Sequence, residues 1–203
     1  MKKDLLEKVR RNLYPGSEHI IEAMDVIDRK YFISDPYIDT AIPIGHEQTI
    51  SQPSTVGRML MLAELKKGDK VLEIGTGSGW NAALIAYIVY PGKVLSLDII
   101  SALLDKARDN IQPLQSLVPN LELKLQNIFK KPISERYDKI IITAGINPPD
   151  KSYIIELAQS NLRDKGILIC PHIQGPIIIL RNNEGKIEEE QTPEHYVFVN
   201  LMQ

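Results

Sequence analysis

The chain has 203 residues, of which 43% are hydrophobic, and this is enough to form one domain with a sizeable core. Its formal net charge of -2 gives no sign of a polyanionic partner such as nucleic acid, and its apolar runs are shorter than a bilayer span. The single cysteine, Cys170, excludes an internal disulfide framework, and the four histidines have no metal-ligand spacing. We therefore expect a single domain over residues 1–203, monomeric and cytoplasmic, without a metal site and without membrane contact.

Residues 1–52 are expected to form a helical extension followed by a substrate loop. Apolar residues recur at helical spacing over residues 4–12, and a second helix is expected to begin at Ser17, which can act as its N-cap. Residues 33–52 contain prolines and a glycine and have no helical period. Loops of this length in compact domains are often functional.

From residue 53 to residue 203 the pattern changes to strands that alternate with helices. We expect helices over residues 53–66, 79–90, 101–116 and 150–162, and strands over residues 70–74, 93–98, 121–125, 138–143 and 166–170. Parallel strands need crossover helices, so the alternation predicts an α/β fold with a Rossmann-like, doubly wound and mostly parallel sheet. Further strand patterns without helices predict antiparallel C-terminal strands at one edge, over residues 176–180, 186–190 and 195–201.

The stretch VLEIGTGSGW, residues 71–80, leads from an apolar strand directly into three glycines. A dinucleotide site needs the pattern G-x-G-x-x-G after its strand. Counted from Gly75, the last position is Trp80, which is too bulky for close packing of the helix on the strand. Counted from Gly77, the pattern fits, with Ala82 in the last place. The spacing of the glycines therefore leaves NAD open as a ligand.

Two acidic residues distinguish between the candidate cofactors. Glu73 lies within the strand before the glycines, where a carboxylate would repel a pyrophosphate and favour a cationic ligand. Asp98 ends the next strand, where an acid can accept hydrogen bonds from both ribose hydroxyls. S-adenosylmethionine has a sulfonium, an ammonium group, a ribose and no phosphate, so it is the cofactor that we expect. Thr143 is expected to face the same cleft, whereas Asp138 is expected to have a structural role.

The segment AIPIGHEQTISQPS, residues 41–54, precedes the first helix of the alternating region. Pro53 suits the first turn of that helix, because its missing N–H group costs nothing there. A hydroxyl group beside a helix N-terminus can help to bind a carboxylate, which makes Ser51 a candidate for substrate binding. The alternative is that Ser51 and Ser54 only cap the helix.

Three segments in chain order, AIPIGHEQTISQP, KGDKVLEIGTGSGW and YDKIIITAG, resemble protein-L-isoaspartate O-methyltransferases. With IEAMDVIDRKYF upstream, the resemblance covers nearly the whole chain, and the TIS loop is its most specific part. It implies a Rossmann-like, S-adenosylmethionine-dependent enzyme that methylates the free carboxylate of L-isoaspartyl residues in damaged proteins and peptides. The resemblance makes Ser51 the active-site serine, residues 75–79 the cofactor loop, and Asp98 the acid that binds the ribose.

The motifs and the resemblance together define the expected site. The cofactor-binding residues are expected to be Thr49, Ser51, Glu73, Gly75, Thr76, Gly77, Gly79, Asp98, Ile99, Asn127, Ile128 and Thr143. The residues that contact the isoaspartyl substrate are expected to be Ile44, Gly45, His46 and Val197. An ionised carboxylate is itself the nucleophile, so the reaction needs alignment of the reacting atoms rather than a strong general base. Ser51 would then orient the carboxylate.

The chain departs from the family pattern at three places. Glu47 stands where members usually have glycine and adds a negative charge near an anionic substrate. Asn127 replaces the acid of a Gly-Asp-Gly run beside the adenine amino group, and residues 143–147 replace a more alanine-rich run. Two alternatives therefore stay open: a methyltransferase of the same fold that acts on a small molecule or tRNA, and a binding module that has lost cofactor affinity. A tRNA face would use basic residues that solvated helix charge also explains, namely Lys2, Lys3, Lys8, Arg10 and Arg11.

Overall fold

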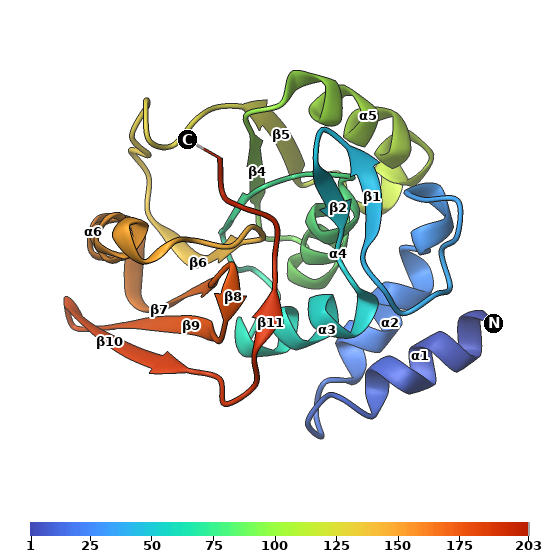
Figure 1. The fold of residues 1–203 in the computed structure, drawn as a ribbon, viewed down its shortest axis with the longest axis horizontal. Coiled ribbons are helices and arrows are strands. Elements are labelled where there is room, and N and C mark those ends of the chain that lie inside the picture. The colour runs from blue at the N-terminus through green and yellow to red at the C-terminus, as the bar shows by residue number, and fades with distance from the viewer. Residues whose placement is uncertain (203) are drawn as a thin grey trace.

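A seven-stranded sheet forms the centre of the structure, a computed structural model that describes residues 1–202 (Figure 1). The strand order is β10-β9-β7-β6-β3-β4-β5. The neighbours from β7 to β5 are parallel, whereas β9 pairs antiparallel with both β7 and β10. The strands are β3 (Val71–Ile74), β4 (Val94–Asp98), β5 (Leu121–Leu125), β6 (Tyr137–Ile142), β7 (Leu162–Pro171), β9 (Ile177–Asn183) and β10 (Lys186–Gln191). The predicted Rossmann-like, mostly parallel α/β fold with antiparallel strands at one edge is confirmed.

Helices cover both faces of this sheet. In Figure 1, α6 lies to the left of the sheet and α3 and α4 lie to its right, with α1 and α2 outside them. None of the described helices is long and apolar enough to cross a lipid bilayer. The helices are α1 (Lys2–Arg10), α2 (Glu18–Val26), α3 (Pro53–Leu62), α4 (Trp80–Val89), α5 (Ser101–Ile111) and α6 (Lys151–Asn161), with the short 3-10 helices η1 (Arg29–Tyr31), η2 (Gln112–Leu117) and η3 (Pro148–Asp150).

The strands β3, β4 and β6 at the centre of the sheet are buried at nearly every position, so both faces of the sheet are covered there. Along β7, Ile167 and Ile169 belong to one buried cluster, whereas Leu168 and Cys170 belong to the other. Successive side chains of a strand point to opposite faces, so each face receives every second residue. Burial raises the pKa of the Cys170 thiol, which fits the packing role of a small hydrophobic residue.

The N-terminal helices pack against the helices of the alternating region. Leu5 of α1 and Ile20 of α2 are buried in the same apolar cluster as Leu60 of α3 and Leu84 of α4. Residues before and after position 53 therefore share one continuous core.

The sequence predicted a loop over residues 33–52, but only part of this segment is a loop. It contains a β-hairpin in which β1 (Ile42–Gly45) pairs antiparallel with β2 (Gln48–Ile50). This hairpin lies over α4 and beside α5 in Figure 1. The loop expected to bind substrate is thus held on a short two-stranded sheet.

Three further elements are shorter than the sequence predicted. The helix expected over residues 53–66 ends at Leu62. The helix expected over residues 101–116 ends at Ile111 and continues as η2, because Pro113 has no N–H group for an α-helical hydrogen bond. The strand expected over residues 195–201 is reduced to β11 (Tyr196–Val197), which pairs with β8 (Gln174–Gly175).

Asp138 has the structural role that the sequence predicted. Its carboxylate accepts a hydrogen bond from the Lys70 N–H group at 2.7 Å and pairs with Arg163 at 2.9 Å. It lies near the start of β6, at the opposite end of that strand from Thr143.

Candidate active site

A cavity opens at the carboxyl ends of β3 and β4, where ligands of open α/β sheets bind. Its walls are the glycine turn after β3, the segment from β2 to the start of α3, and residues 199–202. The space outside the atoms amounts to about 960 Å³, a figure that includes open solvent at the mouth. The expected site residues in the lining are Thr49, Ser51, Gly75, Thr76, Gly77, Asp98, Ile99, Asn127, Ile128 and Thr143.

Hydrogen bonds within the protein hold the backbone of the glycine turn. The N–H groups of Gly75 and Thr76 both donate to the carbonyl of Leu97, at 2.8 and 3.2 Å. The N–H group of Gly77 donates to Oδ2 of Asp98 at 2.8 Å. Turns that bind phosphate instead direct free N–H groups toward the anion. This turn is therefore poorly suited to a pyrophosphate, a point that the glycine spacing alone left open.

Asp98 ends β4, and two backbone N–H groups hold its carboxylate at the cavity. Oδ2 accepts the hydrogen bond from Gly77, and Oδ1 accepts one from the Ile100 N–H group at 2.9 Å. A carboxylate oxygen has two lone-pair sites, so each oxygen can still accept a hydroxyl group such as those of a ribose. Ile99 and Leu103 line the cavity beside it and add an apolar wall.

Glu73 lies behind the cavity wall and is fully buried. Nδ2 of Asn81 donates to its Oε1 at 2.7 Å, and the Ser96 hydroxyl bonds to its Oε2. The same Ser96 hydroxyl lies 2.7 Å from the hydroxyl of Thr76. Burial, assisted by the nearby charge of Asp98 and opposed by these hydrogen bonds, raises the pKa of Glu73 to about 8. At neutral pH this side chain is a neutral carboxyl that links lining residues, whereas the sequence predicted a charge in contact with the cofactor.

Thr143 follows β6 and fixes the start of the glycine turn. Its hydroxyl donates to the carbonyl of Gly75 at 2.6 Å. Gly75 has φ +101°, and a Cβ atom added there would lie 2.3 Å from Oγ1 of Thr143. Only glycine allows this backbone angle together with so close a contact.

Ser51 follows β2 and lines the cavity together with Thr49. Its carbonyl accepts a hydrogen bond from Arg29 at 3.2 Å, whereas its hydroxyl has no hydrogen-bond partner among residues 1–202. The hydroxyl is therefore available to a ligand in the cavity.

Asp39 occupies the N-terminus of α3, which the sequence predicted as a carboxylate site. Its Oδ1 accepts the Ser54 N–H group at 2.9 Å, and its Oδ2 accepts the Ser54 hydroxyl at 2.7 Å. Gln52 adds a hydrogen bond to Oδ2 at 3.2 Å. Ser54 thus takes part in the cap, and the protein's own carboxylate takes the place that the sequence predicted for a substrate carboxylate.

Asn127 and Ile128 follow β5 and line the cavity on the far side of β4. Oδ1 of Asn127 accepts the Phe129 N–H group at 2.9 Å, and the carbonyl of Ile128 accepts the Tyr153 hydroxyl at 2.7 Å. The Asn127 oxygen keeps a second acceptor site, so the side chain can both accept a hydrogen bond from a ligand and donate one through its NH₂ group.

Besides Glu73, five expected residues lie outside the lining, namely Ile44, Gly45, His46, Gly79 and Val197. Gly79 allows α4 to approach α5, since a Cβ atom there would lie 2.9 Å from Cδ1 of Ile111. Ile44 is buried close to Gly77, while Val197 is 81% exposed on β11. Gly45 and His46 are exposed at the tip of the hairpin.

The C-terminal wall of the cavity was not predicted. Residues 199–202 line the cavity, and Sδ of Met202 lies 3.7 Å from Nε2 of Gln48 on the hairpin. Figure 1 shows this segment, in red, running up from β11 past the ends of the sheet strands.

Other residues of the lining were also missed. The sequence could have indicated Ser78, Trp80 and Asn81, because they belong to or follow the glycine motif. The other lining residues that were missed are Gln48, Ile50, Val56, Met59, Ile74, Leu97, Ile100, Leu103, Gln126 and Ala144.

The hairpin tip holds two residues in the left-handed backbone region, His46 with φ 54° and Glu47 with φ 59°. Glu47 is exposed and lies outside the lining of the cavity. Its charge is therefore a weak reason to expect a different acceptor, and its backbone angle explains why glycine suits this position.

Glu47→Gly is expected to raise the free energy of unfolding by about 0.5 to 1 kcal/mol, because glycine adopts positive φ without steric cost. Urea denaturation of the two proteins measures the difference. Glu47→Ala keeps the Cβ atom and is expected to bring no gain. Equal gains in both variants would show that the charge, not the backbone angle, is unfavourable.

The family model of protein-L-isoaspartate(D-aspartate) O-methyltransferase matches residues 1–203. The protein-L-isoaspartate O-methyltransferase of Fervidobacterium nodosum is 36% identical over 196 residues, which cover 91% of this chain and 94% of the relative. The enzyme of the same name from Ignicoccus hospitalis is 33% identical over 208 residues, which cover 99% of this chain and 93% of the relative.

Structural comparison extends the similarity over the whole length. A Plasmodium falciparum structure, described as a protein-L-isoaspartate O-methyltransferase in complex with S-adenosyl-L-homocysteine, has a TM-score of 0.85 and 23% identity. The match covers 98% of this chain and 97% of that one, so the fold is the same from end to end. With the family model and the curated relatives, this shows that the chain belongs to the protein-L-isoaspartate(D-aspartate) O-methyltransferase family.

Proposed function

We propose that this protein transfers a methyl group from S-adenosylmethionine to the free carboxylate of L-isoaspartyl residues in damaged proteins and peptides. The observation that carries the proposal is one cavity that brings the Ser51 hydroxyl together with the glycine turn and Asp98. Family membership supports the acceptor, because the curated relatives are named for this reaction.

The residues of the cavity fit S-adenosylmethionine better than a dinucleotide. The N–H groups of Gly75, Thr76 and Gly77 are engaged within the protein, so they are not offered to phosphates. Asp98 keeps acceptor sites for ribose hydroxyls and would repel a nearby phosphate. The Plasmodium falciparum structure contains S-adenosyl-L-homocysteine, the demethylated form of this cofactor.

The protein's part in the reaction is to hold and align the acceptor. S-adenosylmethionine supplies an electrophilic methyl group on a sulfonium. The substrate carboxylate is ionised at neutral pH, so no residue has to remove a proton from it. The Ser51 hydroxyl would donate to one carboxylate oxygen and so direct the other toward the methyl carbon. Apolar lining residues such as Ile50, Met59 and Leu201 would limit water at this point.

The test is methyl transfer from radiolabelled S-adenosylmethionine to an isoaspartyl peptide, with the matching aspartyl peptide as control. Label on the isoaspartyl peptide alone is expected. Ser51→Ala is expected to lower the rate by about a hundredfold, the low end of the loss for one oxyanion contact. Ser54→Ala is the matched control, because the Ser54 hydroxyl bonds to Asp39 outside the lining. No label on either peptide would overturn the proposed acceptor.

Asp98→Ala is expected to weaken the binding of S-adenosylhomocysteine by about tenfold to a hundredfold, because a charged acceptor for the ribose is lost. Isothermal titration calorimetry measures the dissociation constant directly. Asp105→Ala removes an acidic side chain that is 70% exposed on α5 and is expected to bind like the wild type. Unchanged binding in Asp98→Ala would contradict the assignment of the ribose position.

The tRNA acceptor finds less support in the structure. Three of the basic residues proposed for it form ion pairs: Lys2 with Asp25 and Asp28, Lys8 with Asp39, and Arg10 with Glu7.

Among residues 1–202, no group of three His, Cys, Asp or Glu side chains is arranged to hold a metal ion. A monomer that acts in the cytoplasm stays a prediction from the sequence.

A further inference from the structure

Arg29, the first residue of η1, is a buried cation in the segment IEAMDVIDRKYF, and no site role was predicted for it. The residue is 2% exposed. Burial lowers the pKa of its guanidinium to about 10, an effect that the charge of Asp39 partly opposes, so it stays charged at neutral pH. Buried charges are usually paired with an opposite charge. The hydrogen bonds of the Arg29 side chain go to backbone carbonyls instead.

These carbonyls belong to the two ends of the segment that carries the hairpin. Nη1 of Arg29 donates to the carbonyls of Pro36 and Ile38, at 3.1 and 3.0 Å. Nη2 donates to the carbonyls of Thr40 and Ser51, both at 3.2 Å. One planar group thus ties the chain before β1 to the residue that follows β2. A lysine could not do this, since its ammonium group has three donors and no fixed fork.

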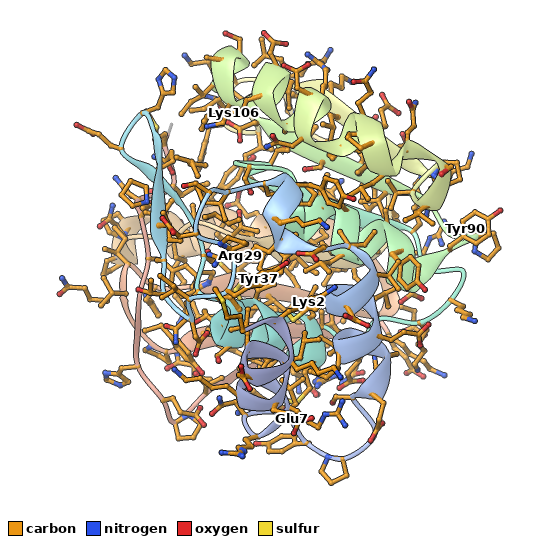
Figure 2. All side chains as sticks on the ribbon, turned by 90° about the vertical axis from the view of Figure 1, so that its right-hand side faces the viewer. Lys2, Glu7, Arg29, Tyr37, Tyr90 and Lys106 are labelled. Carbon is orange, nitrogen blue, oxygen red and sulfur yellow. The ribbon has the colours of Figure 1, made fainter. Side chains whose placement is uncertain are left out.

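The guanidinium also contacts a residue of the cavity wall. Its Cζ atom lies 5.3 Å from the ring centroid of Trp80, a cavity-lining residue that begins α4 directly after the glycine turn. Nε1 of Trp80 donates to the carbonyl of Ile27 at 3.0 Å, which fixes the ring. In Figure 2, Arg29 lies beside Tyr37, and both line one small cavity together with Trp80. Arg29 therefore lies between the cofactor turn and the acceptor segment.

One donor of Arg29 is left without a partner. Its Nε atom is buried and forms no hydrogen bond among the described residues. An unpaired buried donor costs free energy. The orientation of the side chain is thus set by the bonds of its two Nη atoms to the loop carbonyls, rather than by pairing all five of its N–H groups.

We infer that Arg29 is a positioning residue for the acceptor: through the carbonyl of Ser51 and the loop before β1, it sets where the Ser51 hydroxyl stands relative to the glycine turn. This inference rests on the proposed function of Ser51. A misplacement of about 1 Å at a reacting group can lower a rate about a hundredfold. Loss of Arg29 would therefore act on the acceptor step more than on cofactor binding.

The test compares Arg29→Ala with and without added guanidinium ion. The variant is expected to lower kcat/KM for the isoaspartyl peptide by about a hundredfold while S-adenosylhomocysteine binds within about threefold of the wild type. Guanidinium, which can enter the vacated site, is expected to restore activity at least about tenfold, and methylammonium is expected not to. Arg29→Lys keeps a charge without the planar fork, and its peptide turnover is expected to remain low. If Arg29→Ala does not fold, peptide turnover and cofactor binding are compared in Arg29→Lys instead.

Arg58→Ala is the matched control. Arg58 is also a buried arginine, 8% exposed, which stacks on Tyr14 and pairs with Glu194 outside the cavity lining. Its loss is expected to lower stability while kcat/KM stays near the wild-type value. Wild-type turnover in Arg29→Ala, or equal losses of cofactor binding and turnover without guanidinium rescue, would overturn the inference.

Failure of the proposed function is a separate outcome. It would appear as a wild-type protein that binds S-adenosylhomocysteine but does not methylate the peptide. Hydrogen exchange over residues 36–51 then decides the role of Arg29. Faster exchange in Arg29→Ala that guanidinium reverses would support the loop anchor, and unchanged exchange would overturn it.

Discussion

Gly75→Ala is expected to lower the free energy of unfolding by about 3 kcal/mol or more, because two separate costs meet at this residue. The backbone has φ +101°, and the new Cβ atom would lie 2.3 Å from Oγ1 of Thr143. That hydroxyl cannot simply move away, since it donates to the carbonyl of Gly75 at 2.6 Å. Urea denaturation measures the loss, and calorimetry with S-adenosylhomocysteine reports the accompanying distortion of the cavity.

Gly68→Ala separates the two costs. Gly68 has φ +92°, but a Cβ atom there meets nothing within 4 Å, so this variant is expected to lose only about 1 to 2 kcal/mol. The double variant Gly75→Ala/Thr143→Ala removes the contacting oxygen and is expected to recover part of the loss. If Gly75→Ala cost no more than Gly68→Ala, the contact with Thr143 would not constrain the turn.

The second large effect concerns the pH dependence of stability. The pKa of Glu73 is about 8 in the folded protein, above its ordinary value of 4.5, so the folded state keeps a proton that the unfolded chain releases between these values. The proton on the buried Glu73 carboxyl therefore stabilises the folded state fully below about pH 4.5. This stabilisation decreases as the pH rises and is lost above about pH 8. Its size is of the order of 5 kcal/mol.

Glu73→Gln is expected to remove this dependence, because glutamine resembles the neutral carboxyl and can keep both hydrogen-bond partners, Asn81 and Ser96. Urea denaturation at pH 6 and pH 8.5 should show the variant gaining stability over the wild type as the pH rises. Glu122→Gln, on the exposed edge of β5, is expected to show no such change. A constant difference between wild type and Glu73→Gln at both pH values would mean that Glu73 is ionised throughout.

The sequence predicted the central sheet well because its signal is local. Apolar strands followed by amphipathic helices fix a parallel sheet, and a glycine run at a strand end marks the ligand-binding edge. The hairpin was missed because its tip, His46–Glu47, takes the left-handed conformation without a glycine or an asparagine to indicate it. The last strand was overestimated because an apolar pattern does not say whether a segment pairs in a sheet or crosses a cavity.

The candidate site was predictable where one side chain carries the chemistry. Asp98 and Ser51 belong to recognisable motifs, and both line the cavity. Glu73 was placed in contact with the cofactor because the sequence does not show that Ser96, on the neighbouring strand, takes up its carboxyl group. Arg29 lies in a segment that resembles the family, but the sequence did not indicate its role, since it bonds to backbone carbonyls, which every residue possesses.

Asp39 has a practical consequence for work with this protein. Sulfate and phosphate ions commonly settle at the N-termini of helices, where they can compete with an anionic substrate. At the start of α3 the chain already supplies that anion to the Ser54 N–H group, so an added buffer ion would have to displace the Asp39 carboxylate. Methyl-transfer rates should therefore be nearly the same in phosphate and in zwitterionic buffers of equal ionic strength, and crystals grown from sulfate should carry no ion at this helix.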